Sequence, residues 1–91
     1  MADEQAREAA ERVFEILAMP TYDDAIKLQV CIRYLQTCTD DVFADFPREC
    51  KAIVAGAFEY GATWQMVAEA ADIDVAEAKR RWADVAGQGT P

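Results

Sequence analysis

Histidine and serine are both missing from the 91 residues of this chain. Their absence removes the usual nucleophile–base pairs of hydrolytic enzymes and the commonest nitrogen ligand of zinc. The three cysteines, Cys31, Cys38 and Cys50, form no C-x-x-C pair, so neither a metal site nor a cofactor is expected. No glycine-rich phosphate loop is present, and paired acidic residues occur only where helices are expected to begin. We therefore expect that the chain is not an enzyme.

Long apolar runs are also missing, so no membrane span is predicted. The N-terminal residues MADEQAREAAERV carry acids where a signal peptide would carry bases, which predicts a cytoplasmic protein. An odd number of cysteines in such a protein indicates reduced thiols. Cys31 and Cys38 are seven residues apart and fall on one helix face. They are interpreted as buried small apolar residues, and the alternative is a redox switch.

Positive charge is scarce, since nine Lys and Arg residues stand against seventeen Asp and Glu residues, a net charge of −8. The imbalance is uneven along the chain. Residues 1–46 hold four basic and ten acidic residues, whereas residues 47–91 hold five basic and seven acidic residues. Nucleic-acid-binding proteins usually show a basic excess. Because salt screens charges beyond about 8–10 Å, a duplex would respond mainly to the nearly balanced second half.

Apolar residues recur at the helical period, and no segment shows the alternation typical of a strand. The predicted fold class is all-α, with about five helices. The first is expected over residues 3–18, ended by Pro20, and the second runs from a Thr21 cap to Thr37. Residues 38–46 are predicted to form a connection with at most a single helical turn. The predicted inward stripes are Ala6, Ala10, Val13, Phe14 and Leu17, and then Ala25, Leu28, Ile32 and Leu35.

Three shorter helices are predicted in the second half. Pro47 suits the first turn of a helix that ends near Tyr60, and Gly61 suits the left-handed position that follows it. Thr63 is expected to cap a helix over residues 64–71, and Asp74 to cap the last helix. The last helix is predicted to bury Val75, Ala78, Trp82 and Val85.

These helices are predicted to form one compact domain with two functional parts. Residues 1–45 are expected to be a helical pair for dimerisation or partner contact, because a chain this short builds a modest core on its own. Residues 46–86 form the second unit, and residues 87–91 are expected to be a disordered tail.

The segment GATWQMVAEAADIDVAEAKRRW, residues 61–82, has the pattern of a helix-turn-helix, which joins two short helices by a turn of about three to four residues. Ala68 is small enough for the point where the helices meet, and Ile73 plugs the angle between them. The stretch from Phe46 to Trp82 resembles region 4 of bacterial sigma factors and related helix-turn-helix regulators. The matching residues are Phe46, Pro47, Gly61, Thr63, Trp64, Val67, Ala68, Glu69, Ile73, Lys79 and Arg81.

This resemblance implies that the helix after Asp74 enters the major groove of DNA. Two positions depart from the pattern. Asp72 stands where glycine is usual, although aspartate tolerates a left-handed backbone better than most residues. The first turn of the last helix offers Val75, Ala76 and Glu77 in place of polar base readers, so its direct contacts are limited to thymine methyls and a cytosine amino group.

Two functions are therefore expected from the sequence. The first is a small transcriptional regulator that binds double-stranded DNA as a homodimer. Its predicted DNA contacts are Thr63, Trp64, Gln65, Val75, Ala76, Lys79 and Arg80. The alternative is a protein-interaction module on the same scaffold, which contacts RNA polymerase, a sigma factor or another regulator. Simpler roles compete at several positions: Thr63 as a cap, Trp64 and Trp82 as scaffold aromatics, and Lys79-Arg80-Arg81 as charge near a helix C-terminus.

Overall fold

The computed structural model describes residues 4–86, which form six helices and contain no strand, so the predicted all-α class is confirmed. The predicted tail, residues 87–91, lies outside the described residues. Within residues 4–86 no helix is long and apolar enough to cross a bilayer. The helices are α1 (Glu4–Ala18), α2 (Asp24–Thr37), α3 (Asp40–Asp45), α4 (Pro47–Glu59), α5 (Trp64–Ala71) and α6 (Val75–Ala86).

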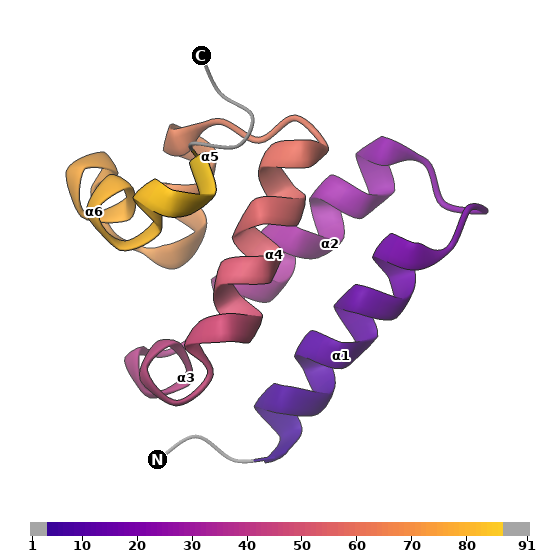
Figure 1. Ribbon diagram of the computed structural model, residues 1–91, viewed down its shortest axis with the longest axis horizontal. Coiled ribbons are helices and arrows are strands. Elements are labelled where there is room, and N and C mark those ends of the chain that lie inside the picture. The colour runs from indigo at the N-terminus through magenta and orange to yellow at the C-terminus, as the bar shows by residue number, and fades with distance from the viewer. Residues whose placement is uncertain (1–3, 87–91) are drawn as a thin grey trace.

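Helix α4 lies in the middle of the molecule, with α1 on one side and α5 and α6 on the other (Figure 1). It packs against α1, α2, α3 and α6, while α2 packs against α1, α4 and α5. The described residues of the two predicted parts therefore share one core. Leu35, Ile53, Val54 and Val67 are its largest fully buried aliphatic side chains.

Helix α2 begins two residues later than predicted. Asp23, not Thr21, is its N-cap, and the Ile26 N–H donates to Asp23 Oδ1 over 2.9 Å. Both residue types are good caps. Asp23 takes the position because it has the extended backbone that a cap needs, whereas Thr21 lies within the turn that follows Pro20.

The buried face of α2 also differs from the predicted stripe. Only Leu35 of that stripe is buried, and the other buried residues of α2 are Cys31 and Tyr34. Tyr34 reaches α1, where its hydroxyl donates to the Ala6 carbonyl over 3.3 Å. Helix α2 is therefore rotated toward α1 and α4. Leu28 and Ile32, which are half-buried, instead line a groove against Met66 of α5.

The connection between α2 and α4 contains a helix of six residues, α3, where a single turn at most was predicted. Thr39 caps it by accepting from the Val42 N–H over 3.4 Å. Val42 is buried, and Phe43 packs beside Trp82 of α6 with ring centroids 5.7 Å apart. Contacts distant in sequence therefore stabilise a helix that is too short to form by itself.

Two positions require glycine, one within α4 and one just after its end. Gly56 lies where α4 meets α1, and a Cβ there would stand 3.0 Å from Leu17 Cδ1. Gly61 follows the end of α4 with φ +109°, as the sequence predicted. The Ala62 N–H then donates to the Ala57 carbonyl over 2.9 Å, which closes the helix end and directs the chain toward α5.

Candidate nucleic-acid interface

Helices α5 and α6 are joined by the three residues Asp72, Ile73 and Asp74, as predicted. Asp72 is left-handed, with φ 60° and ψ 44°, although it is not glycine. The Ile73 N–H donates to the Ala68 carbonyl over 3.0 Å, which closes the end of α5. Asp74 then caps α6, because its Oδ1 accepts from the Glu77 N–H over 2.7 Å. Two short helices are thus joined by a closed turn of three residues, within the turn length that a helix-turn-helix uses.

Helices α5 and α6 pack against each other, and each buries small side chains. Val67 and Ala68 of α5 are buried, and so is Ala78 of α6. Ile73 is half-buried and packs on the core. Trp82 and Val85 of the predicted inner stripe of α6 are also buried, whereas Val75, at the start of the helix, is half-buried.

Leucine at position 68 is expected to lower the free energy of unfolding by about 1–3 kcal/mol, because overpacking a filled core forces strained rotamers or backbone shifts. Ala68 is only 2% exposed, so the added atoms have no route to solvent. Thermal or urea unfolding measures the loss. Ala52→Leu, the same change at an exposed position of α4, is the matched control and should leave stability unchanged. Equal stability of both variants would show that α5 is not tightly packed at Ala68.

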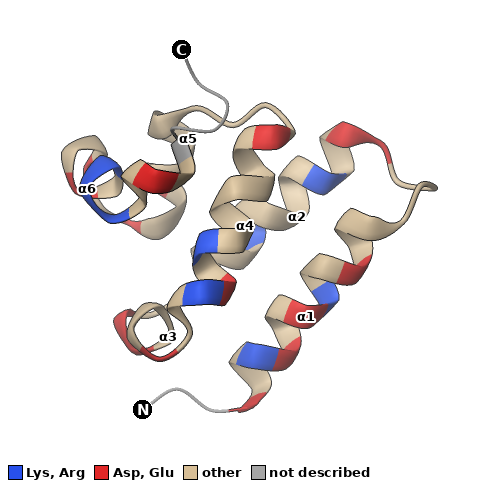
Figure 2. Ribbon diagram, viewed as in Figure 1, with Lys and Arg blue, Asp and Glu red and all other residues tan. Residues whose placement is uncertain are grey.

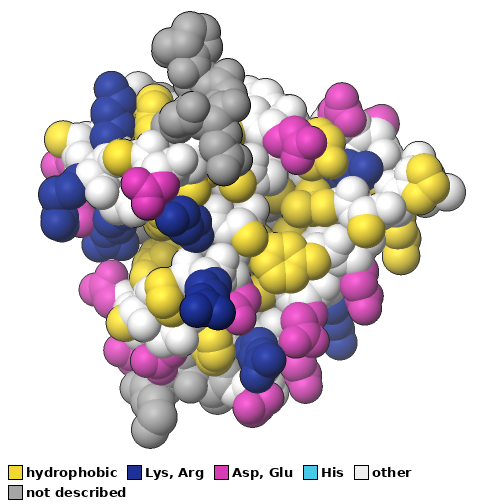
Figure 3. Space-filling view, viewed as in Figure 1, with side chains coloured by type: hydrophobic (Ala, Val, Ile, Leu, Met, Phe, Trp, Pro, Cys, Tyr) yellow, Lys and Arg dark blue, Asp and Glu magenta, His cyan; other side chains and the backbone are white. Residues whose placement is uncertain are grey.

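The outer face of α6 is open to solvent. Ala76, Lys79, Arg80 and Ala83 are all exposed, as the predicted free face requires. Val75, also a predicted DNA contact, is half-buried and packs partly against the core. Lys and Arg residues lie along α6 and the first half of α4 (Figure 2), and Figure 3 shows their dark-blue side chains at the same part of the surface. These two helices hold the five basic residues of the second half of the chain: Arg48, Lys51, Lys79, Arg80 and Arg81.

The carboxylate of Glu77 forms ion pairs with two of these basic residues, Arg80 and Arg81. Glu77 Oε2 lies 2.6 Å from an Arg80 terminal nitrogen and 2.8 Å from Arg81 Nε. The hydrogen bonds from Arg80 and then Arg81 lower the pKa of Glu77 below its ordinary value, and the same pairing raises the pKa of Arg80. Glu77 and Arg80 therefore stay charged near neutral pH. The positive charge that Arg80 offers to a ligand is partly compensated by its own helix.

The three predicted contacts at the start of α5 have structural roles. Thr63 caps the helix, with its hydroxyl accepting from the Met66 N–H over 3.2 Å. Trp64 is half-buried and meets Phe58 edge to face, with centroids 4.8 Å apart. Gln65 donates from Nε2 to Glu69 Oε1 over 3.0 Å. Of the seven predicted contacts, the structure places Ala76, Lys79 and Arg80 together on one exposed helix face.

A pair of thiols that was not predicted lies at the end of α2 and in the first turns of α4. Cys38 Sγ donates to the Tyr34 carbonyl over 3.3 Å, and Cys50 Sγ donates to the Val42 carbonyl over 4.0 Å. The interaction between the two thiols lowers the pKa of Cys38 and, with burial, raises the pKa of Cys50, while burial alone raises the pKa of Cys31 to about 11. The predicted burial is confirmed for Cys31, whereas Cys38 is half-buried. A spacing of twelve residues across two turns gave no local signal for this contact.

Comparisons of the chain with protein-family models, with curated proteins and with solved structures found no match.

Proposed function

We propose that α5 and α6 form a helix-turn-helix that binds double-stranded DNA, with α6 as the recognition helix. The observation that carries the proposal is the combination at α6 of a buried inner stripe, a tight turn before it and an exposed outer face with Lys79 and Arg80. This arrangement is the one in which a recognition helix lies in the major groove and its neighbour rests on the backbone. The resemblance to sigma region 4 supports the same role.

The charge of the protein sets the strength of this binding. Each neutralised phosphate adds about 0.9 to the slope of log affinity against log salt. With Lys79 and Arg80 as the bases on the outer face, one copy should bind weakly and with a shallow slope. We therefore propose that two copies act together. The large apolar side chains exposed on the N-terminal half, Met19, Tyr22 and Ile26, support a homodimer contact there.

A salt titration with a labelled duplex tests this function. Lys79→Ala should lower the salt slope by about 0.9 and weaken binding to all sequences alike, because a phosphate contact carries no sequence information. Arg12→Ala removes the same charge from α1 and should change neither quantity. The stoichiometry from the same titration should be two copies per duplex. Absence of duplex binding by the wild-type protein even at low salt would eliminate the proposal.

The second candidate is a protein-interaction module on the same scaffold, with RNA polymerase, a sigma factor or another regulator as the partner. The ion pairs of Glu77 with Arg80 and Arg81 favour it, because an acid at the reading position opposes phosphate. In this case Lys79→Ala and Arg80→Ala would weaken capture of an acidic protein partner, and no duplex binding would exist to be altered.

A further inference from the structure

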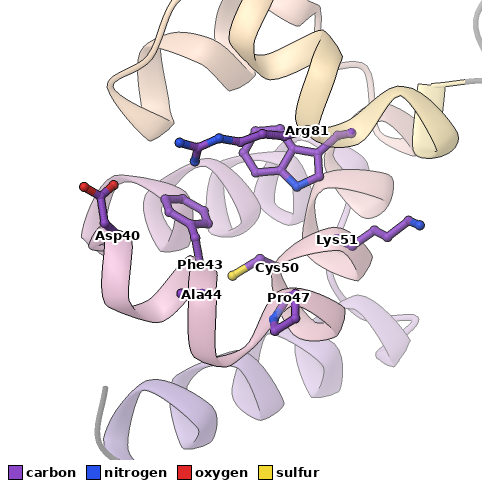
Figure 4. A pocket seen from close by; sticks show the side chains of 8 residues that line it. Asp40, Phe43, Ala44, Pro47, Cys50, Lys51 and Arg81 are labelled. Carbon is purple, nitrogen blue, oxygen red and sulfur yellow. The ribbon is translucent and has the colours of Figure 1, made fainter. Parts of the chain in front are cut away.

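A pocket of about 450 Å³ lies between α3, α4 and α6 (Figure 4), and its lining includes neither Lys79 nor Arg80. This volume falls within the range of small-molecule pockets, about 300–1,000 Å³. Its floor is apolar and is formed by Phe43, Ala44, Pro47, Cys50 and Trp82. The backbone of Trp82 departs from helical geometry here, with φ −124° and ψ 30°, so α6 bends at the pocket wall.

Charges of opposite sign stand at the mouth. The Arg81 guanidinium lies over the Phe43 ring, 5.6 Å from its centroid, and the Asp40 carboxylate projects from α3 at the same side of the opening (Figure 4). Arg81 Nε donates to Glu77, and Glu77 is the one acceptor seen for Arg81 within residues 4–86. The terminal nitrogens of a guanidinium carry four further N–H groups, enough to bind a carboxylate in a bidentate manner.

Lys51, the remaining charged residue of the lining, does not take part. It extends away from the Arg81 guanidinium in Figure 4 and is paired with Asp84, with Nζ 3.1 Å from Oδ2. Of the lining residues, the mouth therefore presents the acid Asp40 and the base Arg81, whose Nε is paired with Glu77, above an apolar floor. A polyanion would meet Asp40, a simple cation would meet Arg81, and a purely apolar ligand would leave both charges desolvated without a partner.

We propose that this pocket binds the zwitterion of an α-amino acid with an apolar side chain. The ligand carboxylate binds the terminal nitrogens of Arg81, its ammonium binds Asp40, and its side chain packs on the floor formed by Phe43, Ala44 and Cys50. The site is separate from the outer face of α6, so it stands whether or not that face binds DNA.

The test is NMR titration of the full chain with L-phenylalanine, following the backbone amides of residues 40–51 and the Trp82 indole N–H. We expect saturable shifts confined to the pocket, with a Kd on the order of 1 mM for so small a ligand. Two analogues each lack one charge: 3-phenylpropionate and 2-phenylethylamine. Each should bind about tenfold or more weaker, since it loses one charge-assisted contact. Equal affinity of either analogue, or shifts scattered outside the pocket, would overturn the proposal.

Variants test the two mouth residues. Arg81→Gln and Asp40→Asn should each weaken L-phenylalanine binding about tenfold. The controls are Arg33→Gln, an exposed arginine of α2 that does not line the pocket, and Asp41→Asn, and neither should change the affinity. Glu77→Gln acts in the opposite direction, because it frees Arg81 Nε from its carboxylate, and should tighten binding severalfold. This variant keeps the test decisive if Arg81→Gln fails to fold. Unchanged affinity in both Asp40→Asn and Glu77→Gln would refute the assigned contacts.

Discussion

Trp82→Ala is expected to lower the free energy of unfolding by about 3–5 kcal/mol, the cost of truncating a large buried aromatic residue. Trp82 is 5% exposed and packs against Phe43, so the substitution leaves a cavity between α3 and α6. The total stability of a domain this size is about 5–15 kcal/mol, so a large share of it would be lost. Urea unfolding followed by circular dichroism measures the change.

Trp64→Ala is the matched control for this experiment. Trp64 is half-buried and contacts Phe58 at the start of α5, so its truncation opens a smaller cavity and should cost clearly less. Trp82→Phe keeps a ring in the core and should recover most of the loss. Equal destabilisation by Trp82→Ala and Trp64→Ala would contradict the assignment of Trp82 to the centre of the packing between α3 and α6.

Features that depend on local chemistry were predicted well from the sequence. Pro47, Gly61 and Thr63 mark helix ends by backbone conformation or by a single hydrogen bond, and each lies where it was expected. The turn at Asp72 and Ile73 was found in the same way, because a left-handed residue and an apolar plug are local requirements of a helix-turn-helix. Local signals predicted the wrong residue where two neighbouring residues are both good caps, as with Thr21 and Asp23 before α2.

Features that depend on tertiary packing could not be predicted from local sequence patterns. The rotation of α2 is set by contacts of Tyr34 with Ala6 of α1, twenty-eight residues away. Helix α3 is held by Phe43 against Trp82, and no periodicity exists in six residues to reveal it. The ion pairs of Glu77 with Arg80 and Arg81 were also not predicted, but the sequence does indicate them. Residues three and four positions apart on one helix are neighbours on its surface.

That pairing leads to the prediction that bears most directly on function. Glu77→Gln should raise affinity for duplex DNA by about tenfold at low salt, because it removes one like charge from the phosphate-facing helix and releases Arg80. If the released Arg80 gains a phosphate contact, the salt slope should steepen by about 0.9. Fluorescence anisotropy with a labelled duplex, repeated over a range of salt concentrations, gives both quantities.

Glu15→Gln is the control, because it removes the same charge from an exposed position of α1 and leaves α6 unchanged. If net charge alone governed binding, the two variants would gain equal affinity for the duplex, and the assignment of α6 as the recognition helix would be wrong. If only Glu77→Gln gains affinity for the duplex, the carboxylate of Glu77 weakens the binding of α6 to DNA through a local effect. If neither the wild type nor Glu77→Gln binds a duplex at low salt, the outer face of α6 belongs to a protein partner, for which the ion pairs of Glu77 would keep Arg80 and Arg81 in fixed positions.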